Sequence, residues 1–225
     1  NDISKEEGYA WFDMKREELR PWINGPYAFS RSPLKARDAN SLVFTKENYQ
    51  TFPNLLFSAN IDAQRKSLFA EAASAGGSQL AVNKQLSLSN IRQISDANPQ
   101  QSEYNWGSIE TVQWTSLTGE KLSGLLVKPQ GFDPSKKYPM IVNFYEKLSD
   151  ELNRHRAPDF HRSQINYTVY ASRGYLIFAP DIPYRIGYPG ESAYDAIVSG
   201  VTSLLDKGFV DPKRVALQGH SWGGY

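Results

Sequence analysis

The pattern of hydrophobic and polar positions changes about halfway along the chain. Up to about residue 105, short apolar runs alternate with clusters of turn-forming residues. The runs are GYAWFD (8–13), SLVFTK (41–46) and NLLFSANI (54–61), and the turn-forming clusters are RDANS (37–41) and TFPN (51–54). This spacing predicts short antiparallel strands joined by tight turns.

Strands of this kind fit a β-propeller, whose blades take about 40–50 residues each. The first half of the chain would supply about two blades, and because a propeller needs at least about four, we expect the others upstream of the given sequence. The segment LFAEAASAGGSQLAVNKQL, between Leu68 and Leu88, is low in complexity and predicts a loop or an insertion.

From Ser108 onward the apolar runs become longer. SIETVQW (108–114) and KLSGLLVKP (121–129) flank Thr118-Gly119, which predicts a hairpin turn. Three later runs are almost continuously apolar and predict strands buried on both faces. These runs are YPMIVNFY (138–145), YLIFAPD (175–181) and RVALQ (214–218).

The segments between these strands carry a helical pattern. SQINYTVYASRG (163–174) predicts a helix closed by Gly174. SAYDAIVSGVTSLLDKG (192–208) predicts a second helix, with Ser192 and Asp195 in a capping-box pattern. Its apolar stripe and its closing glycine are Ile197, Val201, Leu204, Leu205 and Gly208. Alternating strands and helices predict a mostly parallel sheet.

Composition narrows the functional classes. The 225 residues are 40% hydrophobic, and the mean hydropathy of -0.53 predicts a soluble globular protein. A net charge of +1 gives no electrostatic reason to expect nucleic acid or an anionic membrane surface as a partner. No apolar run is long enough to span a bilayer. The absence of cysteine excludes disulfides, thiol nucleophiles and cysteine-based zinc sites.

The last residues, VALQGHSWGGY (215–225), contain a Gly-x-Ser-x-Gly pattern directly after an apolar strand, and this context predicts a nucleophile elbow at Ser221. A serine on so tight a turn adopts strained backbone angles, and side chains at Gly219 and Gly223 would collide. Gly224 would let the next helix pack close to the sheet. Backbone N–H groups at the start of that helix would face a developing oxyanion. The alternative is a glycine-rich strand–helix turn with an incidental serine.

The stretch KGFVDPKRVALQGHSWGGY (207–225), preceded by YPMIVNFYE (138–146) and GYLIFAPD (174–181), resembles the prolyl oligopeptidase family of serine peptidases. Its dipeptidyl-peptidase-like and acylaminoacyl-peptidase-like members are the most similar. The resemblance implies that residues 1–107 are the last blades of a partial β-propeller. It also implies that residues 108–225 are the N-terminal part of an α/β-hydrolase catalytic domain. The resemblance is specific over residues 108–225. Over residues 1–107 it is weak and concerns mainly the architecture.

The same resemblance implies roles for three residues. Ser221 matches the nucleophile, and the backbone N–H of Trp222 matches one oxyanion-hole donor. The hydroxyl of Tyr145, just after the strand that follows the YP dipeptide, matches the second donor. The alternative for Tyr145 is an aromatic side chain packed over the edge of the sheet.

Two stretches depart from the family pattern. Glu146-Lys147 stands where many relatives have small residues after the tyrosine. The segment DIPYRIGYPG (181–190) stands where relatives often have a glycine-rich DGRGSG-like loop. We expect Asp181 and Arg185 within it to be loop scaffolding rather than catalytic residues.

A serine nucleophile requires a histidine base and a carboxylate that orients the base, and in α/β-hydrolases both follow the serine in the chain. The histidines here, His155, His161 and His220, all precede Ser221. We expect His220 to point away from Ser221, and the other two to lie in a solvated loop. The spacing of His155 and His161 could suit a metal site, but no third ligand is evident in the sequence. The acid and base are therefore expected beyond Tyr225, and this chain alone is expected to be inactive.

These features predict a serine-type peptidase that hydrolyses short peptides through an acyl-enzyme on Ser221, without a cofactor or a metal. An esterase or another acyl hydrolase would use the same elbow. A non-catalytic binding protein could retain both domains, and downstream sequence without an Asp followed by a His would favour it. The start of the chain has neither an initiating Met nor a signal segment, so the compartment is not predicted, nor is the oligomeric state.

Overall fold

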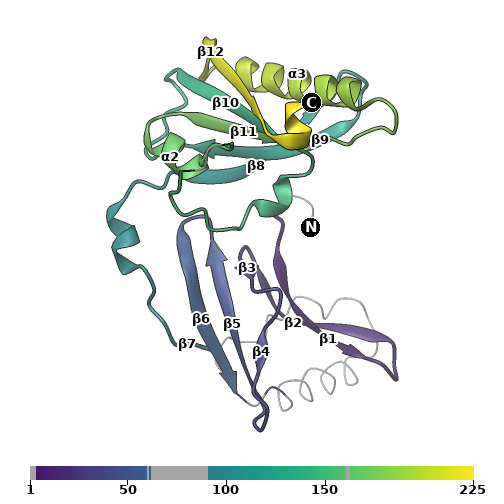
Figure 1. Ribbon diagram of the computed structural model, residues 1–225, viewed down its shortest axis with the longest axis vertical. Coiled ribbons are helices and arrows are strands. Elements are labelled where there is room, and N and C mark those ends of the chain that lie inside the picture. Colours follow the sequence, from purple (N-terminus) through teal and green to yellow (C-terminus); the bar gives the residue numbers. More distant parts are fainter. Residues whose placement is uncertain (1–3, 60, 62–90, 161–162) are drawn as a thin grey trace. The chain divides into compact units, whose positions relative to one another are not determined.

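The computed structural model describes residues 4–59, 61, 91–160 and 163–225 (Figure 1). The chain divides into two compact units. One unit comprises Glu6–Pro99, and the other comprises Gln100–Tyr225 together with Ser4 and Lys5. The predicted loop or insertion between Leu68 and Leu88 lies outside the described residues.

Antiparallel strands build the first unit. β1 (Glu7–Asp13) pairs with β2 (Glu18–Gly25). A second sheet has the order β3-β5-β6-β7, with β4 also paired to β5. Its strands are β3 (Ala28–Phe29), β4 (Leu34–Lys35), β5 (Ser41–Asn48), β6 (Thr51–Ala59) and β7 (Ile91–Gln93). The strands expected at 8–13, 41–46 and 54–61 are confirmed, the last one ending at Ala59. The sequence pattern missed β2, β3, β4 and β7.

The prediction of a turn at residues 51–54 is wrong, because these residues begin β6. The pairing of β5 with β6 shifts in register between Lys46 and Asn48, opposite Phe52 and Pro53. Proline has no N–H to donate, and a bulge removes its position from the regular ladder of hydrogen bonds. The irregular pairing thus accommodates the proline that suggested a turn.

The second unit contains a five-stranded sheet with the order β12-β10-β11-β9-β8. β10 runs parallel to β11 and β12, whereas β9 is antiparallel to β11 and β8, so the described sheet is mixed and not mostly parallel as predicted. The strands are β8 (Ser108–Thr115), β9 (Lys121–Lys128), β10 (Tyr138–Phe144), β11 (Leu176–Pro180) and β12 (Val210–Gly219). The predicted hairpin turn is present between β8 and β9, where Gly119 has a φ of 92°.

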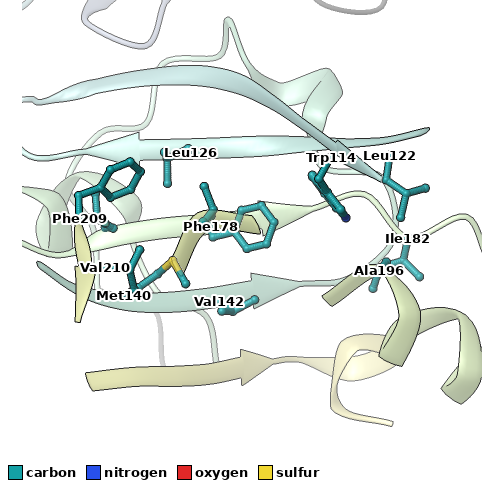
Figure 2. Close-up of a cluster of buried hydrophobic side chains, with 12 residues drawn as sticks. Trp114, Leu122, Leu126, Met140, Val142, Phe178, Ile182, Ala196, Phe209 and Val210 are labelled. Atoms are coloured by element: carbon teal, nitrogen blue, oxygen red, sulfur yellow. The ribbon is translucent and has the colours of Figure 1, made fainter. Parts of the chain in front are cut away.

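Helices cover both faces of this sheet (Figure 1). α3 (Pro189–Asp206) packs on one face over a buried cluster that includes Met140, Val142 and Phe178 (Figure 2). α2 (Tyr167–Ser172) lies on the other face, where the Tyr167 hydroxyl donates to Asn143 Oδ1 at 2.7 Å. Adjacent residues of a strand point to opposite faces, so Val142 and Asn143 contact different helices. Among the described residues, the short 3-10 helices are η3 (Pro99–Glu103), η4 (Ser149–Glu151) and η5 (Ser221–Gly224).

Both helices differ from the prediction at their starts. α3 begins at Pro189, so Ser192 and Asp195 do not form a capping box. A fixed φ suits proline to the first helical position. Asp195 instead accepts hydrogen bonds from the N–H of Leu117 and the hydroxyl of Thr118, which tie α3 to the β8–β9 turn. α2 is shorter than expected and is capped by an Asn166 side chain that accepts from the Val169 N–H.

The buried strands agree with the prediction in two of three cases. Every residue of β11 is buried, and so is the centre of β10. β12 was also expected to be buried on both faces, but Leu217 is 66% exposed. Among the described strands, β12 pairs with β10 alone. No helix in the described part of the chain is long and apolar enough to cross a membrane.

Candidate active site

The backbone reverses sharply at Ser221. His220 is extended, with φ −130° and ψ 145°, and η5 begins at the next residue. Ser221 has a φ of 55°, in the left-handed region that residues other than glycine rarely adopt. The serine therefore occupies a strained position between a strand and a helical turn, the geometry of a nucleophile elbow.

Two of the three glycines around Ser221 have a steric reason to be glycine. A Cβ atom at Gly219 would lie 1.8 Å from the carbonyl oxygen of Gly223, and one at Gly223 would lie 2.2 Å from that of Phe144. Real Cβ atoms essentially never approach other atoms so closely. A Cβ at Gly224 would have only an ordinary contact at 3.8 Å, so close packing against the sheet does not require glycine there.

The ends of two parallel strands bring Tyr145 to the same edge of the sheet as this turn. Phe144 of β10 pairs with Gly219 of β12, and Tyr145 directly follows Phe144. The connection from β10 to β11 runs through α2 on one face, and the connection from β11 to β12 runs through α3 on the other. Ligands of open α/β sheets bind outside the carboxyl ends of strands where such connections diverge. The side chain of Tyr145, which is 41% exposed, lies at this location.

The loop after β11 holds the backbone that follows Tyr145. The Tyr184 hydroxyl donates to the Tyr145 carbonyl at 2.8 Å, and the Ile182 N–H donates to the Glu146 carbonyl at 2.9 Å. The carboxylate of Asp181 accepts from the N–H groups of both Leu148 and Ser149 at 2.8 Å. Asp181 is thus a scaffold residue in this structure, as the sequence indicated. Arg185, the other residue expected to be scaffolding, forms an exposed ion pair with Glu191.

The side chain of Trp222 belongs to an aromatic group that the sequence pattern did not indicate. Its ring meets that of Tyr184 edge-on, with centroids 5.4 Å apart, and stacks on Tyr225 at 5.6 Å. The backbone N–H of Trp222 lies in the first turn of η5, where N–H groups have no intrahelical acceptor. Tyr184 lies in segment 181–190, where relatives often have a glycine-rich loop. This difference in sequence was the one signal that could have pointed to a contact between Tyr184 and Trp222.

Burial raises the pKa of the Tyr184 hydroxyl above 10.0, and the nearby carboxylate of Glu146 raises it further. The hydroxyl consequently remains protonated at neutral pH and can donate its hydrogen bond to Tyr145.

The histidines occupy three different settings. His155 is half-buried, with its ring centroid 5.0 Å from that of Trp106, so the prediction that it is solvated is wrong. His161 lies outside the described residues. His220 is exposed and precedes Ser221 in extended backbone. Within the described ranges, no three His, Cys, Asp or Glu side chains gather in a way that could hold a metal ion.

No protein-family model matches the chain, but individual proteins do. Dipeptidyl-peptidase 5 of Schizosaccharomyces pombe is 27% identical over 130 residues, which are 52% of this chain and 18% of that protein. Dipeptidyl peptidase 4 of Bos taurus is 30% identical over 131 residues, 51% of this chain and 16% of that protein. The chain thus spans less than a fifth of either relative.

A solved structure extends the similarity to nearly the whole chain. Dipeptidyl peptidase 4 of Porphyromonas gingivalis aligns with 96% of this chain and 28% of its own length, with a TM-score of 0.62 and 17% sequence identity. At this identity the alignment shows a shared fold.

Proposed function

This chain belongs to the prolyl oligopeptidase family, and we propose that it carries the nucleophile of a serine-type peptidase. The observation that carries the proposal is the backbone of Ser221, which combines a φ of 55° with flanking glycines that have no room for a Cβ atom. A strained serine that the surrounding backbone enforces points to a functional role for its hydroxyl.

In this proposal, residues 108–225 are the N-terminal part of an α/β-hydrolase catalytic domain. The mixed sheet with helices on both faces supports that assignment. Residues 1–107 are the last blades of a β-propeller, and their antiparallel sheets support this second assignment.

The proposed reaction begins when Ser221 Oγ attacks the carbonyl carbon of a peptide bond. A histidine base accepts the serine proton, and the carbonyl oxygen becomes an oxyanion that accepts hydrogen bonds from the Trp222 N–H and the Tyr145 hydroxyl. Collapse of the intermediate breaks the C–N bond, and the amine leaves with the proton from the histidine. Water then hydrolyses the acyl-enzyme and regenerates Ser221. The base and its carboxylate partner are expected in sequence that follows Ser221.

The proposed substrates are short peptides. The two curated relatives are named as dipeptidyl peptidases, which favours a peptide over a simple ester. Hydrolysis of a peptide p-nitroanilide and of a p-nitrophenyl ester would compare the two classes. A peptidase should show an amide turnover that depends on the peptide sequence.

The nucleophile can be tested with a fluorophosphonate probe on the whole protein that contains this chain. We expect covalent labelling that maps to Ser221 by mass spectrometry and that Ser221→Ala abolishes. Ser172→Ala, at an exposed serine of α2, is the matched control and should label normally. Labelling that survives Ser221→Ala, or that maps elsewhere, would contradict the proposal.

A further inference from the structure

We propose that Tyr184 is a positioning residue that holds the two proposed oxyanion donors, Tyr145 and Trp222, in one arrangement. The inference rests on the proposed function. The inference depends on the side chain of Tyr184, which contacts both donor residues. Tyr184 lies in the loop after β11, whereas the donors follow β10 and β12.

The first contact acts on the backbone of Tyr145. Tyr145 lies just beyond the end of β10, where the hydrogen bonds of the sheet no longer hold the chain. The Tyr184 hydroxyl donates to its carbonyl oxygen at 2.8 Å and so restricts rotation of the peptide group that follows it. The direction in which the Tyr145 side chain leaves the backbone depends on these same torsion angles.

The second contact acts on Trp222. The ring of Tyr184 meets the indole edge-on at 5.4 Å, while Tyr225 stacks on it from another side at 5.6 Å. Because Trp222 directly follows the strained Ser221, movement of its side chain would be transmitted to the turn and to the N–H group that would face the oxyanion. A strained conformation persists only where its surroundings enforce it.

The chemistry of Tyr184 suits both contacts. Burial and the Glu146 carboxylate raise the pKa of its hydroxyl, so the hydroxyl is protonated and can donate at neutral pH. Phenylalanine at this position would keep the edge-on ring contact with Trp222. It would remove the hydroxyl, which donates to the Tyr145 carbonyl and also interacts with the Trp222 side chain. Leucine would lose the ring contact as well. The two variants therefore separate the role of the hydroxyl from that of the ring.

The test uses the whole protein with the substitutions Tyr184→Phe and Tyr184→Leu. We expect Tyr184→Phe to lower kcat about five- to tenfold, the effect of losing one ordinary hydrogen bond, with KM within about twofold of wild type. Tyr184→Leu should lower kcat further. The rate of fluorophosphonate labelling should fall in parallel, because the phosphonyl oxygen would accept hydrogen bonds from the same two donors. Tyr194→Phe, at a tyrosine of α3 that is 64% exposed, is the control.

A double-mutant cycle distinguishes positioning from general stabilisation. If Tyr184 acts through the Tyr145 hydroxyl, Tyr184→Phe should have little further effect on kcat in a Tyr145→Phe background. Full multiplication of the two effects, or wild-type kinetics for Tyr184→Phe, would overturn the inference. If wild-type protein is not labelled at Ser221, the proposed function fails and this inference fails with it. Normal labelling with unaffected Tyr184 variants overturns the inference alone.

Discussion

Gly223 lies against the backbone of Phe144, so closely that a Cβ atom would be 2.2 Å from the Phe144 carbonyl oxygen. The turn that presents Ser221 is therefore packed onto the end of β10, the strand that Tyr145 follows. This contact places the turn and Tyr145 at the same edge of the sheet.

Gly223→Ala should destabilise the protein by about 1–3 kcal/mol, the usual cost of forcing extra atoms into packed structure. It should also suppress labelling of Ser221, because the turn must shift to relieve the collision. Urea unfolding and fluorophosphonate labelling measure the two effects. Gly190→Ala is the control, because a Cβ there meets no atom within 4 Å. Normal labelling of Gly223→Ala would mean that the turn tolerates the displacement.

Tyr145→Phe should lower kcat by about 10²–10³, as expected when one oxyanion donor is lost. The free energy of unfolding should change by less than about 0.5 kcal/mol, because the change removes one hydroxyl from a side chain that is 41% exposed. Steady-state kinetics with a peptide substrate and urea unfolding provide the measurements. An unchanged kcat would show that Tyr145 is not part of the proposed site. Tyr145 would then be an aromatic residue that packs at the edge of the sheet.

Asp181→Ala should destabilise the loop that follows Tyr145. The carboxylate accepts two backbone hydrogen bonds, from Leu148 and Ser149, and a hydrogen bond to a charged group contributes about 1.5–3 kcal/mol. We expect a loss of stability in this range and faster amide hydrogen exchange at both residues. Exchange at wild-type rates would show that other contacts suffice to hold the loop.

Tyr167→Phe should cost about 1–3 kcal/mol near neutral pH, because it leaves the oxygen of Asn143 without the 2.7 Å hydrogen bond from the buried hydroxyl. Burial raises the pKa of Tyr167, and Arg156 offsets only part of the increase. The unfolded state therefore ionises first, near pH 10.0, so this contribution is complete below that pH and is lost as the pH rises through the folded-state value.

The difference in stability between wild type and Tyr167→Phe should accordingly narrow above pH 10.0, as measured by urea unfolding across the alkaline range. The same experiment on Tyr194→Phe is the control, because it removes a hydroxyl from an exposed tyrosine. A constant difference for Tyr167→Phe would indicate that the hydroxyl ionises equally easily in both states.

The sequence by itself determined those features whose physical cause is local. Continuous apolar runs predicted β10 and β11, because a strand buried on both faces needs apolar residues at every position. The stripe from Ile197 to Leu205 predicted the face of α3 that packs on the sheet. The sharp turn at Ser221 could be predicted as well. Its flanking positions have no space for a Cβ atom and are therefore glycine, which is visible in the sequence.

Tertiary structure decided the features that depend on which segments meet. β12 pairs with β10 alone among the described strands, and the hydrophobicity of a strand carries no information about its place in a sheet. Asp195 does not cap α3 but accepts a hydrogen bond from the β8–β9 turn, which is distant in sequence. The contacts of Tyr184 with Tyr145 and Trp222 arise because the order β12-β10-β11 brings the loops after these strands together. Strand order is a property of the folded chain, whereas residue periodicity reports only on each strand alone.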